Sequence, residues 1–200
     1  MEKQNTIEKF LENNNKSIED LSRIDWSVIS SDIYLTELFI EKYEFKLNWE
    51  LISYHQELSE LFIEKYQNKI NWNKISINQK LSESFIEKFQ NKINWDFIST
   101  YQELSESFIE KHQNKLNWSH ISKCQSLSTS FINKYQDKLD WHFISIKYEI
   151  SEESMLKYKN EVDWQHILKN KKISHKTLVL LIGYKFKTDE IKQLYLQQLK

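Results

Sequence analysis

Histidine and cysteine side chains are the groups in this sequence whose types and spacing come closest to a metal site. His120 and Cys124 are four residues apart, so a helix would place them on one face. His142 and His166 occupy nearby positions in the two following stretches of the chain. Together these side chains would bind zinc if their geometry closed around the ion. Nothing equivalent occurs elsewhere in the sequence, and solvent-facing histidine and cysteine are common, so we predict no bound metal and no other cofactor.

Serine recurs at one position of the sequence, every 23 residues from Ser30 to Ser145. A serine nucleophile needs a neighbouring base, and no histidine or acid recurs in register with these serines. The sequence also lacks a glycine-rich phosphate loop and a pair of carboxylates in a plausible cleft. We therefore interpret the serine as a small residue at a close helix crossing, and we expect no enzymatic activity.

Basic residues are concentrated near the end of the chain. The formal net charge of −1 gives no general attraction to nucleic acid, but residues 164–200 carry eight lysines and two acids, a charge of +6. Binding of nucleic acid or of a small anionic nucleotide, which the protein would sequester, is therefore the alternative function. A single arginine argues against bidentate recognition of phosphate or guanine, so we favour a solvated surface and consider nucleic acid an improbable partner. The lysines of this cluster are Lys169, Lys171, Lys172 and Lys176.

Other features of the composition indicate a soluble, intracellular protein. Cys124 is the only cysteine, so no intramolecular disulfide can form and a reducing compartment is expected. The first residues, MEKQNTIEKF, contain no apolar signal region. The longest apolar run, residues 178–182, is far shorter than the ~20 residues that span a bilayer.

An internal repeat predicts the fold. A tryptophan returns at intervals of 23 residues, and an isoleucine follows each one three residues later. The seven tryptophans are Trp26, Trp49, Trp72, Trp95, Trp118, Trp141 and Trp164. A stacking ladder for nucleotide bases would be one use for them. Because each tryptophan shares a helix face with an isoleucine, we interpret them instead as core residues.

Each repeat contains the start signals of two short helices. Asparagine or aspartate precedes every tryptophan from Trp49 to Trp164, and either residue suits the N-cap of a first helix. Ser105, between Leu104 and Glu106, is typical of the N-cap of a second helix. In place of glycine, an asparagine after the second helix would take the left-handed conformation. The candidates for this role are Asn68, Asn91 and Asn114.

Helices of ~8 to 9 residues are too short to be stable alone, so stacked neighbours must stabilise them. We predict an all-α solenoid with at least twelve helices, no β-sheet, and buried tryptophan and isoleucine columns. An N-terminal cap would comprise residues 1–25, with a helix-like stretch at 7–12. Seven two-helix repeats would span residues 26–186. A C-terminal capping helix would occupy 187–200, starting at Thr188 or Asp189 and presenting apolar side chains. These are Ile191, Leu194, Leu196 and Leu199.

The repeat has the form W-x-x-I-S followed by L-S-E-S-F-I-E-K-Y-Q-N-K-I-N. This pattern resembles short tryptophan-containing tandem repeats in proteins of giant viruses that infect amoebae and of some large phages. The resemblance covers about residues 26–186 and agrees with a composition rich in residues with AT-rich codons. It implies a viral origin and a binding role, with the host cytoplasm as the expected location. It supplies no family activity or functional residues to transfer.

Positions two and six after each tryptophan point away from the buried column, at about 100° per residue along the first helix. Their residues differ most between repeats, whereas the buried columns barely change. Neutral drift would also vary exposed residues, but large apolar groups facing water tend to mark interaction sites. We therefore predict that this face binds a host or viral protein. The predicted contact residues are Leu51, His55, Phe97, Tyr101, His120, Phe143, Lys147 and His166.

Overall fold

The computed structural model describes residues 6–182 and 184–199, and these residues form sixteen helices and no strand. The prediction of an all-α repeat fold is confirmed. The chain forms two compact units, Met1–Leu104 and Ser105–Lys200. The first unit contains α1 (Ile7–Asn13), α2 (Arg23–Asp32), α3 (Glu37–Lys42), α4 (Trp49–His55), α5 (Glu60–Lys65), α6 (Trp72–Asn78), α7 (Glu83–Lys88) and α8 (Trp95–Tyr101). The second contains α9 (Glu106–Lys111), α10 (Trp118–Cys124), α11 (Thr129–Lys134), α12 (Trp141–Lys147), α13 (Glu152–Lys157), α14 (Trp164–Asn170), α15 (His175–Leu180) and α16 (Asp189–Leu199).

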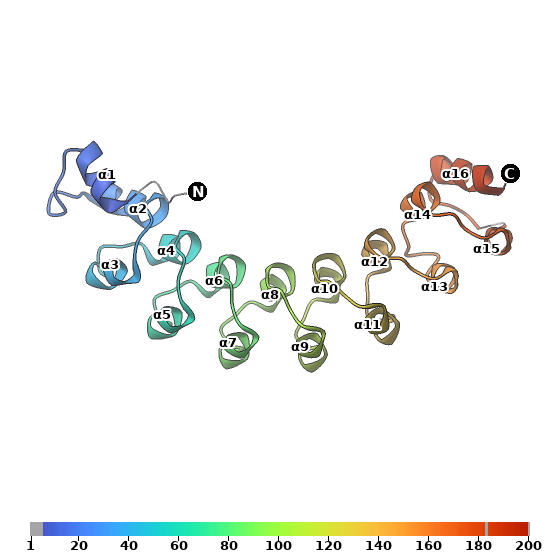
Figure 1. Ribbon diagram of the computed structural model, residues 1–200, viewed down its shortest axis with the longest axis horizontal. Coiled ribbons are helices and arrows are strands. Elements are labelled where there is room, and N and C mark those ends of the chain that lie inside the picture. Colours follow the sequence, from blue (N-terminus) through green and yellow to red (C-terminus); the bar gives the residue numbers. More distant parts are fainter. Residues whose placement is uncertain (1–5, 183, 200) are drawn as a thin grey trace. The chain divides into compact units, whose positions relative to one another are not determined.

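Within each unit the helices form two rows, as in a solenoid (Figure 1). The tryptophan-bearing helices, here called A helices, pack side by side: α2 on α4, α4 on α6 and α6 on α8. In the second unit α10 packs on α12, α12 on α14, and the terminal helix α16 on α14. The second helices of the repeats, here called B helices, form the other row. The division into an N-terminal cap, seven repeats and a C-terminal cap stays a prediction.

The expected caps begin both kinds of helix. The Asn71 side chain accepts hydrogen bonds from the amides of Asn73 and Lys74, at 3.0 and 3.2 Å. The Ser82 hydroxyl accepts one from the amide of Phe85 at 3.2 Å. These bonds satisfy amides that a helix start leaves without partners. Local sequence therefore places the starts of these helices.

The prediction that Asn68, Asn91 and Asn114 adopt the left-handed conformation is wrong. Among the described residues, Asn15 is the only non-glycine residue with a positive φ, at 50°. The B helices end through further turns with ordinary φ angles: the amides of Lys69 and Ile70 both donate to the carbonyl of Tyr66, at 2.8 and 3.2 Å. This turn needs no residue in the left-handed region. The left-handed C-terminal cap occurs instead after α1, where Asn15 donates to the carbonyl of Glu12.

The isoleucine column is fully buried in every repeat, as predicted, but the tryptophan column is not. Trp26, Trp141 and Trp164 are buried, whereas the four tryptophans between Trp49 and Trp118 are half-buried. Their indole rings lie against B-helix aromatics and under lysines. The Trp72 ring is 5.0 Å from that of Phe89, the Lys92 ammonium lies 5.7 Å from the indole, and the indole N–H donates to the Gln67 carbonyl. The tryptophans are thus packed structural residues.

The recurring serine links neighbouring repeats by hydrogen bonds. The Ser53 hydroxyl donates to the carbonyl of Trp49 at 2.6 Å and accepts from the amide of Asn71 in the next repeat at 2.9 Å. The same pair of bonds recurs at Ser30 and Ser76. The serine is therefore required for its hydroxyl as well as for its size.

Seven residues after the tryptophan, a buried side chain bonds the backbone of the preceding repeat. The Gln79 amide oxygen accepts from the amide of Leu58 at 3.0 Å, and its nitrogen donates to the carbonyl of Gln56 at 2.7 Å. In the second unit Tyr148 and Lys171 replace the glutamine, and each still donates to the equivalent carbonyl. We call this series of contacts the glutamine ladder.

The ends of the fold agree in part with the predictions. Helix α1 covers the expected stretch, and Thr188 caps α16 by accepting from the amide of Ile191 at 3.3 Å. Ile191 is buried as predicted, but Leu194 and Leu199 are only half-buried and Leu196 is exposed. Tyr195 is buried in their place, because α16 packs on both α14 and α15 through this side. None of the described helices is both long and apolar enough to cross a membrane.

The lowered pKa of Asp25 predicts that acid destabilises the start of α2. Hydrogen bonds from Lys16 and from Ser22 hold the pKa of Asp25 at about 2, below its usual value of 3.8. A carboxyl whose pKa is lowered by folding stabilises the folded state above its unfolded pKa, and that stabilisation is lost as the pH falls toward the folded pKa. We expect the difference in urea midpoint between wild type and Asp25→Asn to shrink between about pH 4 and pH 2. A constant difference across this range would contradict the prediction.

Candidate functional site

In the first unit, the predicted contact residues lie on the outer side of the A helices. Leu51 and Phe97 are half-buried, whereas His55 and Tyr101 are exposed. Tyr101, 56% exposed, lies 6.3 Å from Phe97 between ring centroids. The two rings form a partly exposed aromatic pair on α8. The sequence already places the two residues four apart on one face of this helix.

A hollow of about 320 Å³ adjoins this aromatic pair, between the C-terminal ends of α6 and α8. Tyr101 forms one side of it, and Ile77 and Leu81 of the preceding repeat contribute apolar surface. Lys80 and Glu103 add a charge of each sign. Such a hollow would accept one side chain of a partner beside the aromatic pair.

Tyr54, which is not among the residues predicted from the sequence, lies on the same face. It is 44% exposed, its ring lies 4.6 Å from that of His55, and the Lys74 ammonium lies 4.9 Å from the ring centroid. Tyr54 is five residues after its tryptophan, whereas the predicted contact residues are all two or six residues after theirs. The variable surface therefore includes position five as well as two and six.

In the second unit, the predicted residues are less available. His120, Phe143 and His166 are half-buried. The ammonium group of Lys123 lies 5.5 Å from the Phe143 ring. The ammonium group of the exposed Lys147 donates a hydrogen bond to the backbone carbonyl of Gln125. Lys147 therefore also joins two repeats.

The groups with metal-binding chemistry do not gather into a site. Across residues 6–182 and 184–199, no three His, Cys, Asp or Glu side chains lie close enough to hold a metal ion. His120 and Cys124 share α10, as the spacing predicts. His142 lies instead near Asp163, with 3.7 Å between Nδ1 and Oδ2.

Two of the four candidate anion-binding lysines bond to other residues of the fold. Lys169 forms an ion pair with Glu190 at 3.0 Å. Lys171 donates to the carbonyl of Tyr148 at 2.9 Å as part of the glutamine ladder, and burial lowers the pKa of its ammonium group. Lys172 and Lys176 are exposed. The cluster therefore offers a phosphate less positive charge than its composition implies.

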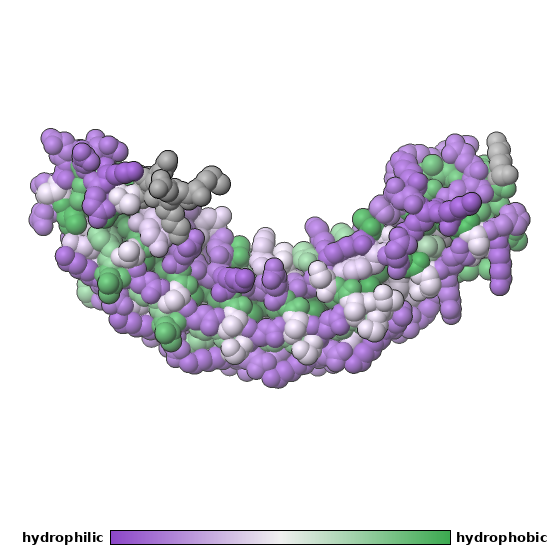
Figure 2. Space-filling view, viewed as in Figure 1, coloured by the Kyte–Doolittle hydropathy of each residue, from purple (hydrophilic) through white to green (hydrophobic). Residues whose placement is uncertain are grey.

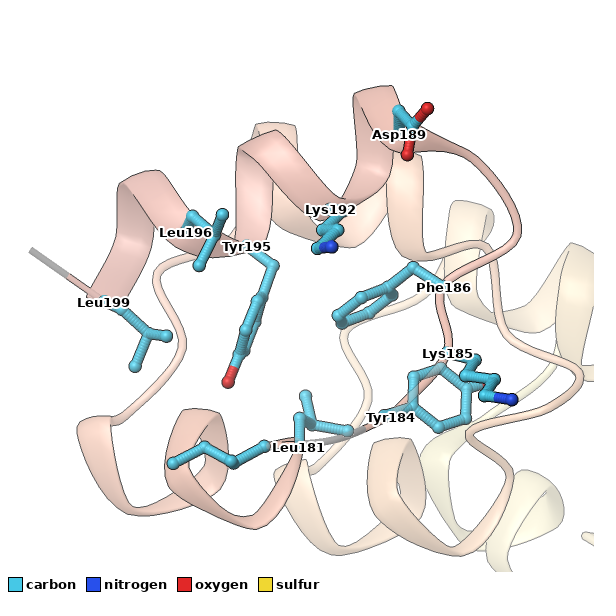
Figure 3. A pocket seen from close by; sticks show the side chains of 10 residues that line it. Leu181, Tyr184, Lys185, Phe186, Asp189, Lys192, Tyr195, Leu196 and Leu199 are labelled. Carbon is cyan, nitrogen blue, oxygen red and sulfur yellow. The ribbon is translucent and has the colours of Figure 1, made fainter.

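A larger cavity, of about 610 Å³, lies between the end of α15 and helix α16 (Figure 3). Tyr195 and Leu199 point from α16 toward Leu181, and Phe186 closes one side. Lys185 and Lys192 are also among its lining residues. We call this cavity the C-terminal groove. The sequence signal for it is the loss of polar residues in KTLVLLIGYKF.

Three strongly exposed apolar residues on the B-helix side were also missed. Leu38, Leu61 and Phe45 are 79%, 80% and 89% exposed. At the repeat position of the two leucines, the next three repeats carry serine, as at Ser84. At the repeat position of Phe45, the next five repeats carry asparagine or aspartate. Figure 2 shows such hydrophobic side chains within a mostly hydrophilic surface. The exposed apolar surface of the first unit is thus not confined to the A helices.

No protein-family model, curated protein or solved structure matches this chain.

Proposed function

We propose that this protein is a non-enzymatic scaffold that binds another protein along the outer face of its A helices. The partly exposed pair of Phe97 and Tyr101, beside the hollow between α6 and α8, carries the proposal. Aromatic side chains that are held in place and partly exposed often dominate the energy of protein interfaces. Tyr54 and His55 extend the same kind of surface within the first unit.

The contrast between constant inner positions and variable outer positions within a repeat supports this proposal. The position of the recurring serine is serine in six repeats and that of the glutamine ladder is glutamine in four, since each holds a backbone group of a neighbouring repeat. The outer positions vary from leucine to histidine, phenylalanine and lysine. A constant framework with a variable surface is the usual construction of a repeat protein that binds a partner.

The identity of the partner is proposed from the resemblance to repeats of giant viruses and large phages. It implies a viral protein that engages a host or viral protein inside the infected cell, in the host cytoplasm. The alternative, binding of nucleic acid or of a small anionic nucleotide at the lysine cluster, has weaker support because Lys169 and Lys171 already bond within the fold.

Replacing Phe97, Tyr101 and Phe143 with serine tests the proposed face. We expect the amount of partner captured from host or infected cells to fall at least tenfold, the effect of losing ~1.4 kcal/mol of binding energy. The partner is to be identified and quantified by mass spectrometry against wild-type bait. Helicity and melting temperature should change little, because none of the three residues is fully buried.

The matched control replaces Leu38 and Leu61, equally apolar residues on the B-helix side, with serine. It should capture the partner as wild type does. Loss of capture in the control alone would move the site to the B helices. A large loss of stability in the triple variant, with binding retained per folded molecule, would show that its residues belong to the core. Capture that collapses at moderate salt would favour the phosphate-binding alternative.

A further inference from the structure

The C-terminal groove lies where a further B helix would pack. In the repeats of the second unit, a B helix lies under its preceding A helix, as the ring contact between Trp118 of α10 and Phe131 of α11 shows. It also adjoins the previous B helix, since Glu106 of α9 accepts from the N-cap Ser128 of α11. The groove has α16, in the A row, on one side and α15, in the B row, on the other. Its place in the fold therefore suits a helix.

The helix that fills this groove must bind differently from the B helices of the repeats. Helices α9 and α11, for example, are joined by Glu106 at the first position of α9 and by the ion pair between Lys134 and Glu110 at 2.8 Å. In α15 these positions hold His175, Val179 and Leu180. Val179 and Leu180 are exposed. A helix packed on α15 would therefore make apolar contacts where neighbouring B helices form hydrogen bonds and ion pairs.

Helix α1 has the chemistry that the groove requires. It is the only described helix without a buried residue, although Ile7, Phe10 and Leu11 form an apolar stripe along one face at helical spacing. All three side chains are only half-buried. Glu8 and Glu12 are exposed and lie together on one flank of that stripe.

The charges of α1 and of the C-terminal groove are complementary. Lys185 and Lys192 line the groove, which has one acidic lining residue, Asp189. Residues 164–200 carry a charge of +6. The acidic flank of α1 would thus meet a basic rim while its apolar stripe enters an apolar cavity. Opposite charges at such a rim favour the correct orientation and raise the rate of association.

We infer that the C-terminal groove of one copy binds α1 of a second copy. Ile7, Phe10 and Leu11 contact the floor formed by Leu181, Tyr195 and Leu199, and Glu8 and Glu12 face the lysines of the rim. The contact joins two different surfaces, so each molecule keeps one free α1 and one free groove. Head-to-tail association of this kind gives open chains or closed rings. The inference is independent of the proposed A-helix interface.

Two single variants test the contact in the full chain by analytical ultracentrifugation. Phe10→Glu places a charge on the stripe of α1, and Leu196→Glu places one at the groove, where Leu196 is 39% exposed. Wild type should show a mass that rises with concentration above the monomer mass of 24.5 kDa. Each variant alone should remain a monomer.

A mixture of the two variants gives the decisive result. Each retains one intact half of the contact, so the mixture should form a dimer and nothing larger. Wild-type protein that stays monomeric at every concentration overturns the inference, and so does a mixture that stays monomeric. A variant that still self-associates, or a mixture that forms larger species, shows a different interface and also overturns it.

A labelled synthetic peptide of residues 6–16 provides a second measurement. It should bind the Phe10→Glu protein, whose groove is intact, and bind at least tenfold more weakly to the Leu196→Glu protein. Leu61→Glu, at an equally apolar exposed position outside both α1 and the groove, is the control and should behave as wild type in both experiments. Circular dichroism of each variant excludes unfolding as the cause. Equal binding of the peptide to all three variants would refute the assignment of the groove.

Discussion

We expect the Trp141→Ala variant to lose ~3–5 kcal/mol of unfolding free energy, the usual cost of truncating a large buried aromatic residue. Trp141 is 2% exposed. Its indole ring stacks on Tyr158, with 4.1 Å between ring centroids and 11° between planes, and its N–H donates to the carbonyl of Gln136 at 2.8 Å. Alanine removes the stack, leaves a cavity and deprives that carbonyl of its donor.

Urea denaturation followed by circular dichroism measures this loss. Trp49→Ala is the matched control, because Trp49 occupies the same repeat position and makes the same kind of N–H bond but is only half-buried. It should lose distinctly less stability, since less apolar surface leaves water there on folding. Equal losses in the two variants would contradict the difference in burial. A broadened transition would indicate that individual repeats unfold separately, as quasi-one-dimensional arrays allow.

The second large effect is expected from Gln79→Leu, which removes one rung of the glutamine ladder. A leucine side chain has nearly the same volume as glutamine, but it leaves the amide of Leu58 and the carbonyl of Gln56 without their hydrogen-bond partners. Each buried polar group without a partner costs ~1–3 kcal/mol. For these two groups we therefore expect a total loss of about 2–6 kcal/mol.

Hydrogen exchange at the Leu58 amide distinguishes this mechanism from a general loss of packing. The exchange rate of that amide should rise more than the rates of amides within α5, whose helical bonds remain. Gln193→Leu, at an exposed position of α16, is the control and should change stability by less than ~0.5 kcal/mol. Unchanged stability of Gln79→Leu would mean that the ladder contributes nothing beyond filling space.

Features that depend on neighbouring residues in the chain could be predicted. The start of each A helix follows from a capping side chain such as Asn71, which reaches amides two and three residues ahead. The burial of Ile52 follows from its place on the face of its helix that also carries the recurring serine Ser53. Both depend on helix geometry alone, which the spacing of residues in the sequence already expresses.

Features of the candidate site depended on contacts between repeats, and here the predictions were less complete. Phe97 and Phe143 were expected to face solvent, but both are half-buried, since side chains of the same and neighbouring repeats lie over the outer positions. No sequence pattern indicated that Lys147 or Lys171 would bond to the backbone of a preceding repeat. A helical wheel describes one helix and contains no information about the neighbour that covers it.

The period, the two helices of each repeat and their buried stripe could be predicted, because these depend on spacings of a few residues. The folded chain shows in addition that the B helices end without left-handed asparagines, that four tryptophans are half-buried, and that the recurring serine and glutamine bond to an adjacent repeat. It also contains the C-terminal groove between the end of α15 and helix α16. The physical reason is that these features depend on which surfaces meet when helices stack, and partners about 20 residues apart in the chain, such as Leu58 and Gln79, become neighbours only in the folded array.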